Sequence, residues 1–139
     1  MNILVIDAQG GGIGRQLVAK LLERIPEADI VAAGTNSMAT NAMIKAGAKK
    51  AATGENAIRY CASQAEIITG PIGILVANAM LGEISPAIAE SVGSSTAPKV
   101  LIPTAHCNTI IAGTKAIPVK DSIEDAVDRI VRIHGGEDN

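Results

Sequence analysis

A buried strand that runs directly into a glycine-rich turn and then into a helix constrains this sequence more than any other feature. The run Ile3-Leu4-Val5-Ile6 is apolar and unbroken, which is typical of a strand covered on both faces. Four of the five positions from 10 to 14 are glycine, and a helical pattern of apolar residues begins at Ile13. Glycine allows a sharp turn and a close approach of ligand to backbone, while the first N–H groups of a helix have no partner within it. The stretch therefore predicts an anion site over the turn, of the kind most often used for phosphate.

Short apolar runs alternate with helical patterns along the rest of the chain. Apolar residues recur at helical spacing up to Ile25, and Pro26 ends that helix. The further apolar runs predict strands at 28–33, 50–53, 65–69, 100–102 and 109–112. This alternation predicts an α/β fold, a Rossmann-like three-layer sandwich with a mostly parallel sheet of five or six strands and helices on both faces. One domain is expected over residues 1–133, followed by a polar tail at 134–139.

Local signals also predict where several helices begin and end. These signals are a cap at Ser37 with a stop at Gly47, a start at Ser85-Pro86, and a capping box of Asp121 with Glu124. The apolar segment 72–81 has two possible interpretations: a helix that crosses the sheet edge, or a contact between copies in an oligomer. Its Asn78 is interpreted as a core residue in preference to a polar anchor in a pocket.

Composition narrows the function classes. Hydrophobic residues make up 47% of the 139 residues, yet there is one Tyr and no Trp or Phe, so the core must be aliphatic. Such an excess in a small domain predicts apolar surface shared with a second copy, and we expect a homo-oligomer. The net charge of -2 and the lack of a Lys/Arg cluster argue against nucleic acid as a partner. The most apolar segment, 67–81, is interrupted and too short for a membrane span, so no membrane partner is expected.

The two cysteines indicate the compartment. Cys61 and Cys107 lie far apart without metal-type spacing, as expected in a reducing cytosol. The first strand begins directly after Met1-Asn2 without a charged and apolar leader, so we expect a cytoplasmic protein. The spacing of Cys61 and Cys107 with His106 and His134 fixes no tetrahedral site, and no metal is predicted.

The loops that follow parallel strands share one edge of the sheet, where ligands bind. The residues expected to hold the ligand are Gln9, Gly10, Gly11, Gly12, Ile13, Gly14, Thr35, Asn36, Thr53 and Gly54. An NAD site needs a carboxylate about 20 residues beyond the turn, whereas this chain has Gly34-Thr35-Asn36-Ser37 there. NAD in its usual mode is therefore disfavoured, and the cofactor is left open between an NADP-type and another nucleotide. Two structural alternatives stay open: the glycines serve helix packing, and Asp7 accepts hydrogen bonds from the amides of its own loop.

Four side chains are weak candidates for chemistry at this edge: Asp7, Glu55, His106 and Cys107. Cys107 beside His106 suggests a nucleophile with its base, but adjacent loop residues rarely point the same way and no orienting third group is identifiable. Asp7 resembles in position the strand-end aspartate of phosphotransferases, whose second aspartate is Gln9 here. No catalytic residue is assigned.

Two resemblances to known families follow from these motifs. The turn Gln9-Gly10-Gly11-Gly12-Ile13-Gly14 resembles the T-G-x-x-x-G-I-G turn of short-chain dehydrogenases, with Asp7 and Ala8 replacing the Thr and the first Gly. Those enzymes use a Tyr with a Lys four residues later. The single tyrosine here is Tyr60, followed at that distance by Gln64. The resemblance therefore does not extend to the catalytic mechanism.

The second resemblance covers nearly the whole chain. The matching segments are Ile6 to Gly14, Gly34-Thr35-Asn36, Thr53 to Ile58, Gly70 to Ile74 and Gly82-Glu83-Ile84. In this order they resemble a small bacterial family, known as a domain of unknown function of about this length. The resemblance implies a Rossmann-like cytoplasmic protein and implies no activity.

Three functional hypotheses follow. The first is a small-molecule binding protein that holds a nucleotide or other phosphate-bearing, anionic ligand at the glycine turn. The second is a small enzyme, a transferase, isomerase or reductase, that uses the same cleft. The third is a homo-oligomeric interaction protein whose glycine turn binds nothing and whose segment 72–81 is the contact surface.

Overall fold

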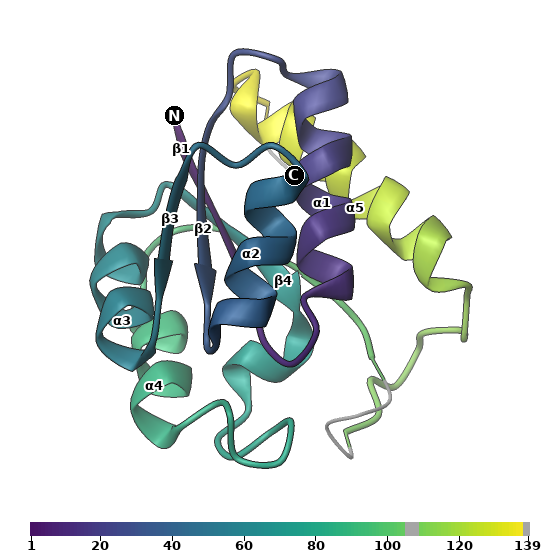
Figure 1. Cartoon of the computed structure of the whole chain (residues 1–139). Coiled ribbons are helices and arrows are strands. Elements are labelled where there is room, and N and C mark those ends of the chain that lie inside the picture. The colour runs from purple at the N-terminus through teal and green to yellow at the C-terminus, as the bar shows by residue number, and fades with distance from the viewer. Residues whose placement is uncertain (105–108, 138–139) are drawn as a thin grey trace.

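The computed structural model describes residues 1–104 and 109–137. Five strands form a single sheet with the order β3-β2-β1-β4-β5, and all pairings between neighbours are parallel (Figure 1). The strands are β1 Asn2–Asp7, β2 Asp29–Gly34, β3 Lys50–Thr53, β4 Ile67–Pro71 and β5 Lys99–Ile102. The helices are α1 Gly12–Arg24, α2 Ser37–Lys45, α3 Glu55–Gln64, the 3-10 turn η1 Ile72–Leu75, α4 Pro86–Ser94 and α5 Val119–His134.

Helices cover both faces of the sheet. One apolar cluster joins residues of α1, α2 and α5 to one face, and a second joins residues of α3 and α4 to the other. In Figure 1, α3 and α4 lie to the left of the strands, and α1 and α5 lie to the right. Residues 3–6 of β1 are fully buried between the two clusters, as the unbroken apolar run predicts. The three-layer α/β fold predicted from the sequence is confirmed.

The order of the strands creates a crevice beside β1. The chain moves outward from β1 to β2 and β3, and then crosses back to place β4 on the opposite side of β1. The loops after β1 and β4 therefore lead away to opposite faces of the sheet. In parallel α/β sheets this reversal is the usual place for a ligand.

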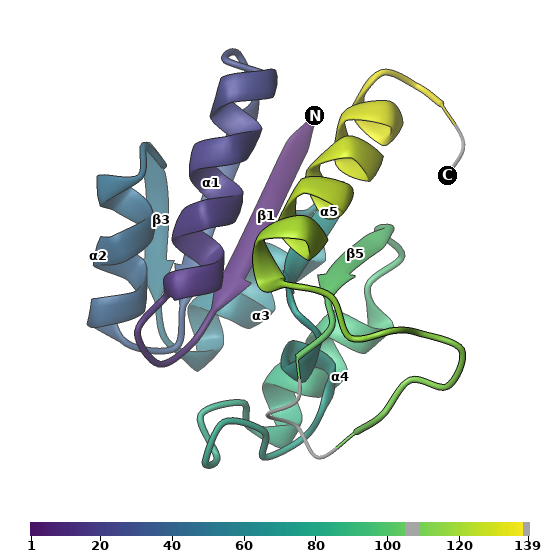
Figure 2. The same ribbon diagram turned by 90° about the vertical axis from the view of Figure 1, so that its right-hand side faces the viewer.

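Two sequence expectations near the C-terminus were wrong. Residues 109–112 form no strand, and Figure 2 shows them in a long loop beside β5. They lie exposed and have no ladder partner in the described part of the chain, and an isolated run of this length cannot form a stable strand. The last helix begins at Val119, directly after Pro118, without a side-chain cap. Proline already has helical φ, so the helix starts two residues before Asp121, and the capping box with Glu124 does not form.

The segment after β4 forms the turn η1 and then a series of tight turns. Asn78 is exposed and has a φ of 65°, so its interpretation as a core residue was wrong. It lies where the chain reverses, and asparagine tolerates left-handed backbone better than most residues. The segment ends at Ser85, whose Oγ accepts the N–H of Ile88 at 3.2 Å, and the predicted helix start at Ser85-Pro86 is confirmed.

The ends of α2 agree with the sequence to within one residue. Asn36 caps the helix in place of Ser37, because its Oδ1 accepts the N–H of Ala39 at 2.9 Å. Gly47 has a φ of 123° directly after the helix, so the predicted left-handed stop is confirmed. In the described residues, no helix combines the length and apolar character needed to cross a bilayer.

Candidate functional site

Asp7 ends β1 directly beneath the start of α1. Its carboxylate accepts the N–H of Ala8 at 2.8 Å and the N–H of Gly14 at 2.6 Å, and only 4% of the residue is exposed. Burial raises the pKa of Asp7 and outweighs the hydrogen bonds from Gly14 and Ala8, which lower it, and the charge of Glu83 raises it further. The chain's own carboxylate therefore occupies part of the positive field at the helix start that the sequence suggested for a ligand.

The glycines of the turn divide into two kinds. A Cβ on Gly11 would lie 2.9 Å from the backbone of Ala39, and Gly11 has a φ of 72°. A Cβ on Gly14 would lie 2.9 Å from Cβ of Asp7 and 2.7 Å from Sδ of Met43. These two glycines are required for the packing of α1 against β1 and α2.

Gly10 and Gly12 differ in every one of these respects. A Cβ on either glycine would meet no heavy atom within 4 Å, and neither has a left-handed φ. Their N–H groups have no hydrogen-bond partner in the described part of the chain. The fold therefore does not require glycine at these two positions, and both residues are exposed and carry backbone N–H groups without a partner among the described residues.

A cavity of ≈ 190 Å³ lies over the turn at the crevice between β1 and β4. It is lined by Asp7, Ala8, Gln9, Gly10, Gly11, Gly12, Ile13, Pro71, Gly73, Met80 and Thr104. The lining comes from β1 and β4 and the segments that follow β1, β4 and β5, whereas the loops after β2 and β3, which were also expected at the site, do not line the cavity. The cavity is smaller than the roughly 300 Å³ of a typical small-molecule site, so it has room for a small ligand or for one group of a larger ligand.

Glu83 links the turn to the end of β2. Its Oε1 accepts the N–H of Gln9 at 2.9 Å, the hydroxyl of Thr35 at 2.6 Å and the amide Nδ2 of Asn36 at 2.9 Å. Burial acts to raise the pKa of Glu83, but these three hydrogen bonds outweigh it and lower the pKa below its ordinary value. Thr35 and Asn36 are thus held by the chain itself.

Sequence reasoning found no carboxylate in residues 34–37 at the end of β2 and assigned no role to Glu83. The structure supplies a carboxylate there, because Glu83 reaches Thr35 from 48 residues further along the chain. No motif or spacing around Glu83 indicates this contact. It depends on the path of the segment 76–84.

The turn that delivers Glu83 has unusual backbone conformation. Met80, Leu81 and Gly82 have φ values of 56°, 58° and 87°, and the N–H of Gly82 donates to the carbonyl of Asn78 at 3.1 Å. Left-handed backbone costs about 1–2 kcal/mol for each residue with a side chain. The conformation places Met80 on the cavity and Glu83 on the glycine turn, and it leaves Leu81 99% exposed. Strain of this kind is frequent at functional sites.

The other predicted site residues lie away from the cavity. The hydroxyl of Thr53 donates to Oγ1 of Thr40 at 2.8 Å, and the N–H of Gly54 donates to the carbonyl of Gly34 at 2.9 Å. The carboxylate of Glu55 accepts the hydroxyl of Ser85, which joins the start of α3 to the cap of α4.

Of the four weak catalytic candidates, Asp7 lines the cavity, Glu55 does not, and His106 and Cys107 lie outside the described residues. No group of three metal-ligating side chains comes together among residues 1–104 and 109–137.

Residues 2–135 match a family model described as a domain of unknown function, DUF3842. The chain belongs to this family. The resemblance identified from five sequence segments is thereby confirmed. No curated protein sequence matches the DUF3842 chain.

Three solved structures are similar to this DUF3842 chain. A dodecameric FMN-dependent UbiX-like decarboxylase from Escherichia coli O157:H7 has a TM-score of 0.51 and 16% identity, over 100% of this chain and 96% of that one. At this identity the likeness concerns the fold alone. A triphenylmethane reductase from Citrobacter sp. (TM-score 0.48, 19% identity, 96% of this chain) and AibC (TM-score 0.46, 14% identity, 97% of this chain) also match. The chain spans 46% and 39% of their lengths.

Proposed function

We propose that this protein binds a small molecule through an anionic group, best supplied by a phosphate, at the cavity over the glycine turn. Nucleotides and other phosphate-bearing metabolites are the ligand class. The observation that carries the proposal is the pair Gly10 and Gly12, two residues that line the cavity and whose N–H groups are unpartnered among the described residues. Neither glycine is needed for packing or for its φ. A missing side chain that the fold does not require is explained by the close approach of a ligand to the backbone.

The charges of the site are compatible with an anion at the two amides. The carboxylate of Asp7 already accepts two backbone N–H groups and is buried on the inner side of the turn. The carboxylate of Glu83 accepts three donors. Each negative charge is therefore partly balanced by its own donors, and the amides of Gly10 and Gly12 are the donors left for a guest. Because two carboxylates lie nearby, the anionic group of the ligand is held only if it accepts short, well-aligned hydrogen bonds from these amides.

A thermal-shift titration tests the proposal. Suitable probes are inorganic phosphate, ribose 5-phosphate, adenosine 5′-monophosphate, NAD and NADP. A ligand present at a hundred times its Kd stabilises the folded state by about 2.7 kcal/mol, so a phosphate-bearing probe at millimolar concentration is expected to raise Tm by several degrees. If no probe raises Tm, the proposal is refuted.

Substitutions then locate the site. Gly10→Ala and Gly12→Ala place a methyl group in the open space where the ligand would approach, and each is expected to weaken binding at least tenfold while leaving Tm of the free protein nearly unchanged. Gly93→Ala is the matched control, because Gly93 is an exposed glycine of α4, on the other face of the sheet. Equal affinity in all three variants and the unsubstituted protein would place the ligand elsewhere.

A further inference from the structure

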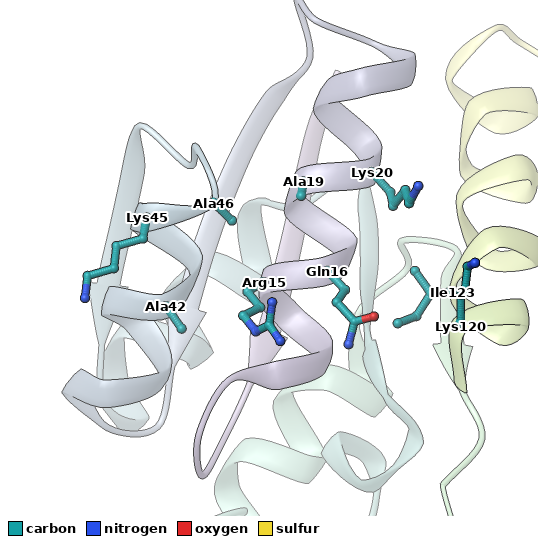
Figure 3. Close-up of a pocket in the computed structure, with 9 residues that line it drawn as sticks. All are labelled: Arg15, Gln16, Ala19, Lys20, Ala42, Lys45, Ala46, Lys120 and Ile123. Atoms are coloured by element: carbon teal, nitrogen blue, oxygen red, sulfur yellow. The ribbon is translucent and has the colours of Figure 1, made fainter. Parts of the chain in front are cut away.

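A basic groove adjoins the glycine turn on the outer side of α1 and α2. One hollow of ≈ 350 Å³ is lined by Arg15, Lys20, Lys45 and Lys120, with alanines of α1 and α2 between them (Figure 3). A second hollow of ≈ 530 Å³ shares Arg15 and Lys45 with the first and extends to Gly10. No aspartate or glutamate lines either hollow. Lys20 is paired with Glu23 at 3.5 Å, whereas Arg15 and Lys45, which the two hollows share, have no such partner among the described residues. The two hollows therefore form one surface whose unpaired positive charge lies on the side that reaches Gly10, a residue that also lines the cavity.

The charges nearest Gly10 are free to bind a ligand. Within the described residues, neither Arg15 nor Lys45 forms an ion pair or a side-chain hydrogen bond, and the same holds for the side chains of Ser37 and Asn41 beside them. Figure 3 shows the side chain of Arg15 beside the first turns of α1, whereas that of Lys45 extends along the outer side of α2, away from Arg15. Both side chains line the second hollow, together with Ser37, Asn41 and Gly10.

The cavity is too small to enclose a ligand of nucleotide size. At ≈ 190 Å³ it is smaller than the roughly 300 Å³ of a typical small-molecule site, so such a ligand extends beyond it. Gly10 lines both the cavity and the second hollow, so the groove of Arg15 and Lys45 is a continuous path out of the site. At the end of β2, Thr35 and Asn36 already donate hydrogen bonds to the negatively charged Glu83. A second negative group of a ligand is therefore better placed in the cationic groove than at the end of β2.

We propose that the ligand carries two separated anionic groups, one held by the amides of Gly10 and Gly12 and the other by Arg15 and Lys45. This inference rests on the proposed function and narrows its ligand class to bisphosphorylated metabolites, including nucleoside bisphosphates. A monophosphate occupies only the amide site. The second group gains charge-assisted hydrogen bonds from Arg15, for which a phosphate is the best geometric match.

Matched pairs of probes test the inference. Isothermal titration at low ionic strength compares adenosine 5′-monophosphate with adenosine 2′,5′-bisphosphate and adenosine 3′,5′-bisphosphate, and fructose 6-phosphate with fructose 1,6-bisphosphate. In the unsubstituted protein at least one bisphosphate is expected to bind tenfold or more tightly than its monophosphate partner. In the double variant Arg15→Gln, Lys45→Gln this ratio should fall to about twofold or less. Added salt should reduce the ratio as well, because the groove is open to solvent.

A charge-matched control separates a local effect from a global one. The double variant Arg59→Gln, Lys115→Gln removes the same charge from exposed positions that line neither hollow, and it should keep the full ratio. All four side chains are exposed, so both double variants are expected to fold, and Tm of the free proteins checks this.

The possible failures are distinguishable. Equal binding of monophosphates and bisphosphates, or a ratio that survives Arg15→Gln, Lys45→Gln, overturns the inference and leaves the proposed function intact. Bisphosphate binding that depends on Arg15 and Lys45 but is unaffected by Gly12→Ala refutes the amide site. It also refutes the two-point ligand. If none of these probes binds, both proposals are refuted.

Discussion

Gly12 and Gly14 lie two residues apart in the same motif, and the structure predicts opposite responses to the same substitution. In Gly14→Ala the new Cβ would lie 2.9 Å from Cβ of Asp7, which is attached directly to the β1 backbone, and 2.7 Å from Sδ of the fully buried Met43. Neither atom can move aside freely. In Gly12→Ala the new Cβ would meet no heavy atom within 4 Å.

The magnitudes follow from these contacts. Overpacking a core position costs about 1–3 kcal/mol, and disturbing the 2.6 Å bond between the Gly14 N–H and the Asp7 carboxylate costs about 1–3 kcal/mol more. Alanine recovers up to about 1 kcal/mol of helix propensity. The expected loss of unfolding free energy for Gly14→Ala is therefore about 1–6 kcal/mol, with a middle value of about 3 kcal/mol. For Gly12→Ala only the helix term remains, so the change is between zero and a gain of about 1 kcal/mol.

Urea unfolding, followed by far-ultraviolet circular dichroism, measures both changes. A domain of 139 residues loses roughly 10 °C of Tm for a destabilisation of about 3 kcal/mol, so a thermal melt gives an independent check. Similar stabilities for the two variants would contradict the division of the turn into packing glycines and open glycines. A destabilised Gly12→Ala would also remove the basis of the proposed ligand site.

Three further predictions concern the carboxylates and the strained turn. The lowered pKa of Glu83 contributes stability above its ordinary value of 4.5 that is lost as pH falls through the folded-state pKa, so Glu83→Gln should flatten the acid side of the curve of unfolding free energy against pH. The pH dependence of stability that arises from Asp7 has the opposite sign. Its raised pKa contributes stability that is complete below its ordinary value of 3.8 and is lost as pH rises through the folded-state pKa. The stability of the unsubstituted protein relative to Asp7→Asn should therefore decline over that window, and a rise would show that the carboxylate is better stabilised than its burial implies. Leu81→Gly relieves the left-handed backbone strain at a residue whose side chain is 99% exposed. Denaturant titration should therefore show a gain of about 0.5–1 kcal/mol in the free energy of unfolding. A loss would mean that the Leu81 side chain makes a contact in solution.

Much of the fold could be predicted because its signals are local. The apolar run of β1, the helical spacing of α1 and the stop at Gly47 depend on neighbours within a few positions. The expectations that failed depended on distant partners. Residues 109–112 have strand composition but no described strand beside them, and Asp121 with Glu124 has capping spacing but follows a proline that starts the helix earlier.

The candidate site divides in the same way. From the order of residues alone it followed that a glycine turn lies between a buried strand and a helix, at the edge of a parallel sheet where ligands are usually found, because an unbroken apolar run and the φ freedom of glycine act over short distances. Only the tertiary structure decided that Gly11 and Gly14 serve packing, while a Cβ on Gly10 or Gly12 would meet open space. The atoms that crowd Gly11 belong to Ala39 and Ala42 of a different helix, α2, and the sequence around Gly11 does not reveal them. Only the tertiary structure could bring Glu83 to Gln9, 74 residues away, because that contact depends on how the chain crosses the sheet and on the left-handed turn that precedes it.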